Sequence, residues 1–379
     1  MTTRINNNKQ NHAYCTMGST ANVPGTGSVN PTKYNSHEMM PKPTVQRRCT
    51  KVCHNNCEAR GCRCDAASKV AAEAAAEIAN RKLRKKISVC YGELDVGSEL
   101  GTGGFCGVHE VRLQSRTFAM KRLKPETLAK QTKYVNGARD LATEAVLLSN
   151  LSHRNIIRVQ GMASGSVRTC INSNEGFFLI VDRLESTLDK QMDEWWDEEE
   201  AMGWMERKRQ RKQRLLKRME VALDIAKGMN YLHSQNLVHR DLKPANIGFD
   251  KDGVVKLFDF GISVRLESSD GRLKEKVGTP RYMAPEMSRR ESYGKSVDMY
   301  AFGLILWQLC ELQKPYMQWN KANLLRQKVA YEGGRPKVAR WWPKAIKDLM
   351  KECWSQDPWE RPDFGVVMNR LEDIVKSAN

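Results

Sequence analysis

Three polar side chains, at a fixed spacing, could together transfer a phosphoryl group. Asp241 lies in the run from His239 to Asn246, and Asp259 follows Asn246 by thirteen residues, directly after an apolar stretch at 254–258. Asn246 and Asp259 offer the hard oxygen donors that Mg²⁺ prefers. Asp241 offers a carboxylate that could orient an attacking hydroxyl and accept its proton. The spacing therefore predicts a site that moves a phosphoryl group onto a hydroxyl.

A glycine-rich segment and a lysine farther upstream suit the phosphates of a nucleotide. Three glycines within 101–104 let backbone N–H groups approach phosphate oxygens, because no Cβ intervenes. Lys121 follows Val108 by thirteen residues in a strand-like run and could hold two phosphates as a point charge. Glu144, beside the apolar stripe of a helical stretch, is a candidate partner that keeps Lys121 extended.

The elements that must position these residues divide into a β-rich part and a helical part. We expect strands around the glycine turn at 94–111, then at 117–123 and 177–181, with a helix at 140–151. Beyond 188 the apolar residues recur mainly at helical spacing. A small β-rich lobe followed by a larger helical lobe is an α+β arrangement.

In this order and spacing, the motifs resemble the signature of eukaryotic protein kinases. The resemblance covers about residues 93–376 and implies the two-lobe kinase fold, with a small lobe at about 93–182 and a large lobe at about 186–376. A charged insertion at 189–218 would extend a pair of helices. The matching motifs are Gly101-x-Gly103, Ala119-Met120-Lys121, Glu144, His239-Arg240-Asp241, Asn246, Asp259-Phe260-Gly261 and Ala284-Pro285-Glu286.

The resemblance implies ATP and Mg²⁺ as cofactors and gives the site residues their roles. The catalytic residues would be Asp241, Lys243, Lys121 and Glu144, and the metal ligands Asn246 and Asp259. The residues expected to contact ATP are Leu100, Gly101, Thr102, Gly103, Gly104, Phe105, Val108, Ala119, Lys121, Val181, Asp182, Leu184, Asn246 and Asp259. Val181 would be the gatekeeper, and the backbone of Asp182 and Leu184 would bind the adenine.

Two positions depart from the family pattern. Cys106 stands where the third glycine of the phosphate loop is expected, and Gly248 replaces a larger apolar residue beneath the adenine. Gly248 is therefore predicted to leave the floor of the adenine pocket open. The resemblance also implies that Asp298 braces the catalytic loop and that Glu286 and Arg361 form a buried ion pair.

The acceptor follows from two further features. Lys243 and the run 278–283 resemble serine/threonine kinases, whereas Trp307 and the run 353–362 resemble the tyrosine-kinase side of the family. The combination resembles the tyrosine-kinase-like group of serine/threonine kinases. It implies transfer of the γ-phosphate of ATP to Ser or Thr hydroxyls of protein substrates, in intracellular signalling.

The loop between Asp259 and Glu286 is a candidate for regulation. Arg240 precedes the catalytic aspartate and could pair with a phosphate on this loop. Ser268 and Ser269 are the favoured acceptors, whereas Thr279 is expected to contact the catalytic loop instead.

The formal net charge of +18 is concentrated towards the N-terminus. Residues 1–93 hold 15 Lys and Arg against 6 Asp and Glu, a balance of +9. We expect a disordered, basic, Cys-rich tail at 1–65 and a helical linker at 66–92. The charge could attract an acidic partner, a membrane surface or nucleic acid, but we favour a solvated tail. No interleaved aromatic residues accompany the charge, which disfavours nucleic acid.

Five cysteines cluster in this tail, namely Cys49, Cys53, Cys57, Cys62 and Cys64. Such a density of thiols could bind zinc, but the paired C-x-x-C spacing is missing, so free thiols are the favoured alternative.

No apolar run approaches the ~20 residues of a membrane helix, and the longest, 300–310, is typical of a core helix. The start of the sequence lacks the apolar stretch of a signal peptide. These features favour an intracellular protein, in the cytoplasm rather than the nucleus. Two other functional classes stay open: a catalytically inactive scaffold, and a nucleic-acid-binding protein that would explain the charge but none of the motifs.

Overall fold

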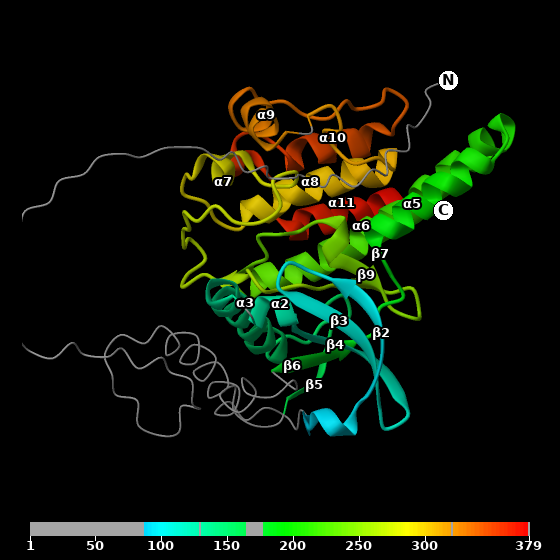
Figure 1. Ribbon diagram of the computed structural model, residues 1–379. Coiled ribbons are helices and arrows are strands. Elements are labelled where there is room, and N and C mark those ends of the chain that lie inside the picture. Colours follow the sequence, from blue (N-terminus) through cyan, green and yellow to red (C-terminus); the bar gives the residue numbers. More distant parts are fainter. Residues whose placement is uncertain (1–86, 129, 164–176, 320, 378–379) are drawn as a thin grey trace, which may run out of the picture. The chain divides into compact units, whose positions relative to one another are not determined.

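The computed structural model describes residues 87–128, 130–163, 177–319 and 321–377, all within one compact unit of the chain, 54–379 (Figure 1). The predicted tail at 1–65, residues 66–86 of the predicted linker and the Cys49–Cys64 cluster lie outside the described residues. The proposals about an acidic partner and about zinc therefore stay predictions.

Within the described residues, a six-stranded sheet forms the small lobe (Figure 1). The strands lie in the order β1-β5-β6-β4-β3-β2, and all neighbours are antiparallel except β1 and β5. The predicted strands around the glycine turn and at 117–123 and 177–181 are confirmed. The strands are β1 (Ile87–Val89), β2 (Asp95–Thr102), β3 (Cys106–Leu113), β4 (Arg116–Leu123), β5 (Val159–Ala163) and β6 (Phe178–Asp182).

The sheet separates two apolar clusters because successive side chains of a strand point to opposite faces. On β4, Phe118 and Met120 pack with Ile180 in a cluster confined to the small lobe. Ala119 lies between them in sequence and belongs to the larger cluster that continues into the other lobe, together with Val181. The strand that carries Lys121 is thereby held from both sides.

Helix α3 (Gln131–Ser149) follows the short helix α2 (Pro125–Leu128) and packs against β4 and β5. Leu141, Ala145 and Leu148 are buried in the large cluster. The helix was expected at 140–151 and begins nine residues earlier. The apolar period starts only where the helix reaches the core, so its first turns give no periodic signal.

Residues 87–92 correct the prediction of a helical linker over 66–92. Ile87–Val89 form β1, which pairs in parallel with β5 at Gly161–Ala163, and Tyr91–Glu93 form the 3-10 turn η1. Val89 is buried in the small-lobe cluster. β-branched residues suit a strand better than a helix, and the free edge of β5 provides the pairing partner.

The large lobe is mainly helical, as the sequence predicts (Figure 1). Its helices are α5 (Leu188–Ala201), α6 (Trp204–Ser234), α7 (Pro285–Arg289), α8 (Ser296–Glu311), α9 (Ala322–Arg326), α10 (Lys344–Cys353) and α11 (Phe364–Lys376). Short 3-10 or π turns are η2 (Pro244–Asn246), η3 (Gln327–Tyr331) and η4 (Pro358–Glu360). Its short strands are β7 (Ser186–Thr187), β8 (Leu237–Val238), β9 (Ile247–Phe249), β10 (Val255–Leu257) and β11 (Val264–Arg265).

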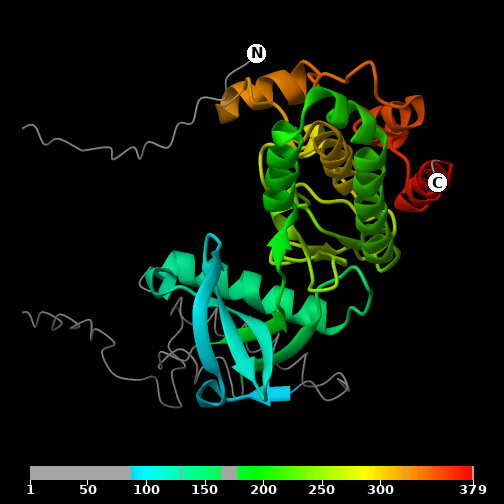
Figure 2. The same ribbon diagram turned by 90° about the vertical axis from the view of Figure 1, so that its right-hand side faces the viewer.

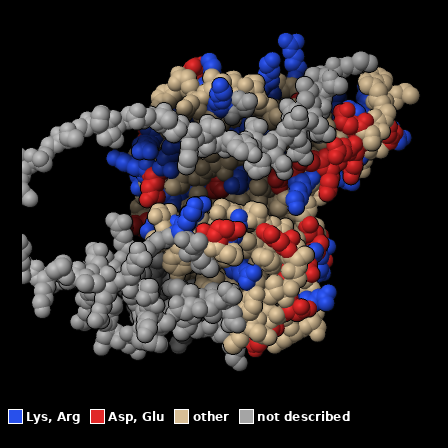
Figure 3. Space-filling view, in the orientation of Figure 1, with Lys and Arg blue, Asp and Glu red and all other residues tan. Residues whose placement is uncertain are grey.

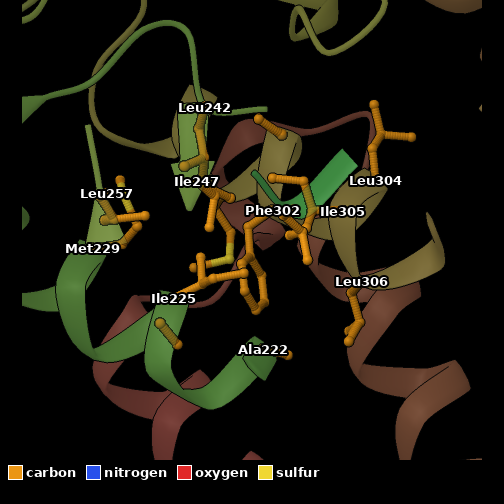
Figure 4. Close-up of a cluster of buried hydrophobic side chains, with 14 of the residues drawn as sticks. Ala222, Ile225, Met229, Leu242, Ile247, Leu257, Phe302, Leu304, Ile305 and Leu306 are labelled. Atoms are coloured by element: carbon orange, nitrogen blue, oxygen red, sulfur yellow. The ribbon is translucent and has the colours of Figure 1, made fainter. Parts of the chain in front are cut away.

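Helix α8 is the centre of this lobe. Every side chain from Val297 to Cys310 is buried, as expected for a helix that is apolar all round. It packs against α6 and α10. Figure 4 shows side chains of α6 and α8 in one cluster with Leu242 of the catalytic loop (His239–Asn246), Ile247 directly after this loop and Leu257 of β10. The core therefore fixes the segments that carry Asp241 and Asn246.

The predicted insertion forms a helical hairpin, here called the α5–α6 hairpin and defined as residues 188–218, beyond which α6 continues to Ser234. Its two helices lie side by side (Figure 2) and are joined by ion pairs, Glu198 to Arg214 at 3.1 Å and Glu199 to Arg218 at 3.0 Å. The expectation that the acidic and basic blocks extend a helix pair is confirmed. None of the described helices is both long and apolar enough to cross a lipid bilayer.

Candidate active site

The carboxylate of Asp241 lies at the centre of a hydrogen-bond network. Its Oδ1 accepts from the backbone N–H of Thr279 at 2.8 Å, and its Oδ2 accepts from Lys243 Nζ at 2.7 Å. Lys243 also donates to the hydroxyl of Thr279 at 2.9 Å. The side-chain amide of Asn246 donates to the backbone carbonyl of Asp241 at 2.9 Å. The carboxylate is therefore fixed in one orientation, and Thr279 contacts the catalytic loop as expected.

Asp298 of α8 holds the backbone of the catalytic loop by hydrogen bonds. Its carboxylate accepts from the backbone N–H groups of His239 at 2.8 Å and Arg240 at 2.9 Å, and from the ring of His233. Burial alone would raise the pKa of Asp298, but His233 and the hydrogen bonds outweigh it and lower the pKa below its usual value. These bonds hold Arg240 at φ 68°, a left-handed conformation that non-glycine residues rarely adopt. The predicted brace is confirmed.

Lys121 joins the two lobes. Its Nζ lies 2.5 Å from Oε2 of Glu144 and 2.7 Å from Oδ1 of Asp259. Burial would lower the pKa of Lys121, but the two carboxylates raise it above its usual value, so the side chain stays charged. Glu144 is only 4% exposed. The sequence-predicted pair of Lys121 and Glu144 is thus in place, and it reaches the aspartate that the chain supplies 138 residues later.

The segment after Asp259 locks this arrangement. Asp259 adopts a φ of 64°, and Phe260 next to it is fully buried with its ring centroid 5.0 Å from that of His239. The backbone N–H of Phe260 lies 3.4 Å from Oε1 of Glu144. The two lobes are therefore linked through Asp259 and Phe260.

The two predicted metal ligands fit Mg²⁺ in their chemistry and placement. The backbone N–H of Phe258 donates to the carbonyl of Asn246 at 3.0 Å, so Asn246 lies beside the strand end that carries Asp259. The amide nitrogen of Asn246 donates to Asp241, which turns its amide oxygen the other way. Oδ1 of Asp259 accepts a hydrogen bond from Lys121, and the second carboxylate oxygen is left to coordinate a metal ion. Two hard oxygens plus phosphates suit Mg²⁺.

The glycine-rich segment forms the turn between β2 and β3. The N–H of Gly103 donates to the carbonyl of Cys106 at 2.8 Å, and Val108 lies opposite both Gly101 and Lys121 in the sheet. A Cβ at Gly101 or Gly104 would meet no atom within 4 Å, so space above the turn stays free. Cys106 is buried, and burial raises the pKa of its thiol to about 12. It packs as a neutral side chain at the third glycine position.

The predicted adenine contacts come from β2, β3 and β4 and from the segment 178–184 between the lobes, here called the hinge. Ala119 and Val181 are direct partners on β4 and β6, and Leu100 and Val108 pack against the same apolar cluster. The N–H of Asp182 donates to the carbonyl of Arg158 at 3.1 Å and that of Glu185 to the carbonyl of Phe249 at 2.8 Å. The hinge is anchored on both sides of Leu184. Thr102 ends β2, and Phe105 begins the return into β3.

The prediction of an open floor at Gly248 is wrong. A Cβ at this position would lie 2.7 Å from Cδ1 of Leu184 and 3.4 Å from the ring of Phe258. The hinge leucine and the aromatic residue before Asp259 therefore occupy the space that the missing side chain leaves. Nothing in the local sequence around 248 indicates this, because both neighbours come from other segments.

Two structural ion pairs complete the surroundings. Arg361 makes a two-pronged contact with Glu286, at 2.6 and 2.9 Å, and both side chains are buried, as predicted. Arg240 pairs with Glu275 at 2.6 Å, a partner that the motif analysis missed. A lone glutamate in a charged loop carries no motif; the only signal was its place between Asp259 and Glu286.

Comparison with known proteins identifies the family. The protein kinase domain model matches residues 94–371. The serine/threonine-protein kinase CTR1 of Arabidopsis thaliana is 30% identical over 309 residues, which cover 79% of this chain and 34% of that protein. The serine/threonine-protein kinase STY17 of the same plant is 30% identical over 78% of this chain and 45% of its own length.

A third relative matches along more of its length. The serine/threonine/tyrosine-protein kinase HT1 of Arabidopsis thaliana is 28% identical over 79% of this chain and 72% of its own length. This chain thus spans about a third to under a half of CTR1 and STY17. The family match covers most of the chain and includes every residue of the site described above, and the chain belongs to the protein kinase family.

Proposed function

We propose that this chain is an ATP- and Mg²⁺-dependent kinase that transfers the γ-phosphate to Ser or Thr hydroxyls of proteins. One observation carries the proposal: every charged group that the reaction needs is present and held by partners. Lys121 is paired with Glu144 and Asp259, and Asp241 is held by Lys243 and Thr279. An inactive scaffold has no need of this arrangement.

Each residue has a distinct task in the proposed reaction. Lys121, kept charged and extended by Glu144, binds the α- and β-phosphates of ATP. Asp241 accepts a hydrogen bond from the acceptor hydroxyl and takes its proton as the new oxygen–phosphorus bond forms and the bond from the γ-phosphorus to ADP breaks. Lys243, within reach of Asp241, donates toward the transferred phosphate. Asn246 and Asp259 would hold Mg²⁺, which when bound neutralises phosphate charge.

The choice of Ser or Thr as acceptor rests on the segment that faces Asp241. Lys243 donates to both Asp241 and Thr279, so the lysine ties the catalytic loop to the substrate-side loop. CTR1 and STY17 are named serine/threonine kinases, whereas the name of HT1 adds tyrosine. The named relatives and the Lys243 contacts favour Ser and Thr over Tyr. A role in intracellular signalling, in the cytoplasm rather than the nucleus, stays a prediction.

The test is a peptide-array assay with radiolabelled ATP on the full chain, beside Asp241→Asn. Wild type is expected to label Ser and Thr peptides, and Asp241→Asn to label them about 10²–10⁴-fold more slowly while still binding ATP. Asp252→Asn, an exposed aspartate of the β9–β10 turn, is the matched control and should retain full activity.

Three outcomes separate the alternatives. Labelling of Tyr peptides alone would reject the proposed acceptor class. Equal rates in wild type and Asp241→Asn would reject the role of Asp241. ATP binding without transfer in either protein would favour the scaffold.

A further inference from the structure

The arginine that precedes the catalytic aspartate is almost completely enclosed by the loop after Asp259. Arg240 is 9% exposed at its side chain. Its Nε donates to the carbonyl of Ile262 at 2.6 Å, and its Nη1 donates to Oε2 of Glu275 at 2.6 Å. A guanidinium withdrawn from water needs an anionic partner, because its charge is otherwise left unsolvated. Glu275 supplies that anion to the enclosed guanidinium, although its own side chain is 68% exposed.

Glu275 is itself fixed to the large lobe through its backbone. The hydroxyl of Tyr293 donates to the carbonyl of Glu275 at 2.8 Å. Leu273 and Tyr293 also exchange two backbone hydrogen bonds, both at 2.9 Å. Tyr293 is buried in the core cluster. The loop is therefore attached on two sides, to Arg240 by charge and to Tyr293 by backbone bonds.

This attachment lies close to the group that orients Asp241. Glu275 precedes Thr279 by four residues, and the N–H of Thr279 donates to Asp241 at 2.8 Å. Between them Gly278 has a φ of +92°, and its position allows no Cβ, because one would lie 2.4 Å from the carbonyl of Arg240. The chain from 275 to 279 is thus tightly constrained against the catalytic loop, and the Arg240–Glu275 pair is one of the contacts that hold it.

A phosphate on this loop would also form an ion pair with the guanidinium of Arg240, and it would carry a larger negative charge than a carboxylate. The predicted acceptors, Ser268 and Ser269, lie elsewhere: the carbonyl of Ser268 accepts from Gly271 in a local turn, and both side chains are exposed. Within the described residues, no hydrogen bond joins either serine to Arg240. The anion position is occupied by a carboxylate that the chain encodes.

We infer that Glu275 takes the place of a loop phosphate and holds the segment 275–279 in its productive position, so that transfer does not depend on phosphorylation of this loop. The inference rests on the proposed kinase function, whose regulation it specifies. Glu275 acts as a positioning residue through Arg240 and Thr279.

The experiment compares five forms of the full chain after treatment with a protein phosphatase: wild type, Ser268→Ala with Ser269→Ala, Glu275→Gln, Glu275→Asp and the control Glu267→Gln. Wild type and the serine double variant are expected to transfer phosphate at equal rates. Glu275→Gln should lower kcat about tenfold with the Kd for ATP unchanged, because the nucleotide site is untouched. Glu275→Asp keeps the charge and should restore most of the activity. Glu267→Gln, an exposed glutamate of the same loop, is the matched control.

A second readout does not require activity. Hydrogen exchange at the amides of Leu273 and Thr279, which are hydrogen-bonded in the structure, should accelerate in Glu275→Gln and not in Glu267→Gln. Loss of activity on phosphatase treatment, or unchanged kcat and unchanged exchange in Glu275→Gln, would overturn the inference. A wild-type chain that binds ATP but transfers nothing contradicts the proposed function, and the exchange data then still decide whether Glu275 holds the loop.

Discussion

The catalytic cluster and the α5–α6 hairpin contain the same kinds of ion pair in different surroundings. In the catalytic cluster, defined as Lys121, Glu144 and Asp259, one lysine bridges the buried Glu144, which is 4% exposed, and Asp259, which is 42% exposed. In the hairpin, Glu198 is 57% exposed where it meets Arg214. On the face shown in Figure 3, acidic side chains gather along the hairpin in contact with solvent.

The difference in burial decides what each pair contributes. Charges withdrawn from water are costly, and loss of one partner leaves the other unsolvated, so a buried pair fixes one arrangement. Charges at the surface are solvated whether paired or not, and such pairs contribute about 0–1 kcal/mol. The catalytic cluster therefore specifies geometry, whereas most of the hairpin pairs can be exchanged at little cost.

The buried pair of Glu286 and Arg361 tests whether burial matters more than proximity to the site. Arg361→Met leaves the Glu286 carboxylate buried without its partner and should lower the free energy of unfolding by about 3–5 kcal/mol. Chemical denaturation measures the change. Arg370→Met, which removes a pair with the half-exposed Glu352, should cost less than about 1 kcal/mol. Equal losses would contradict the distinction drawn between buried and exposed pairs.

Within the catalytic cluster, Lys121→Met should act on catalysis more than on folding. The variant removes the cation that binds the phosphates, and kcat/KM should fall about 10²–10³-fold. Steady-state kinetics with ATP measure the loss. Lys124→Met, on the same segment but outside the cluster, should keep normal kinetics. A similar loss in both variants would mean that the effect is not specific to the cluster.

Asp298 is expected to make the free energy of unfolding depend on pH. Its pKa is lowered in the folded protein, so its charged form contributes stability above the usual pKa of an aspartate, and this contribution is lost as the pH falls. Asp298→Asn should lower the free energy of unfolding by about 1–3 kcal/mol at pH 7.5.

The difference in the free energy of unfolding between wild type and Asp298→Asn should shrink as the pH falls below about 4. Urea titrations at pH 7.5, 5 and 3.5 measure it, with the exposed Asp270→Asn as control. A difference that stays constant with pH would show that the charge of Asp298 is not responsible.

The smallest effects are expected in the hairpin, where two neighbouring glutamates provide a matched pair. Glu198 meets the half-buried Arg214, whereas Glu199 meets Arg218, which is 5% exposed and has its pKa lowered by burial. Glu199→Gln should lower the free energy of unfolding by about 1–3 kcal/mol, and Glu198→Gln should lower it by about 0.2–1 kcal/mol. Thermal unfolding of both variants ranks them, and the reverse order would contradict the role assigned to burial.

Much of the fold and of the site follows from the sequence because the informative patterns are local. Asp241, Lys243 and Asn246 lie within six residues of one another, so their spacing already brings them into one loop. The strand-like run at 117–123 and the helical spacing of apolar residues at 140–151 indicate a strand and a helix from local pattern alone. The predictions failed where a local pattern had to compete with a distant partner, as in β1, which pairs with β5 instead of continuing a helix.

The sequence by itself therefore determined which residues could do chemistry and in which kind of element each one lies. Only the tertiary structure decided which of them meet. Lys121 reaches Asp259, Leu184 and Phe258 fill the space at Gly248, and Glu275 satisfies Arg240. The contacts at Gly248 and between Arg240 and Glu275 join segments whose spacing carries no period or motif. The partners are selected by the need to bury apolar surface and to neutralise buried charge, and these requirements act only in the folded chain.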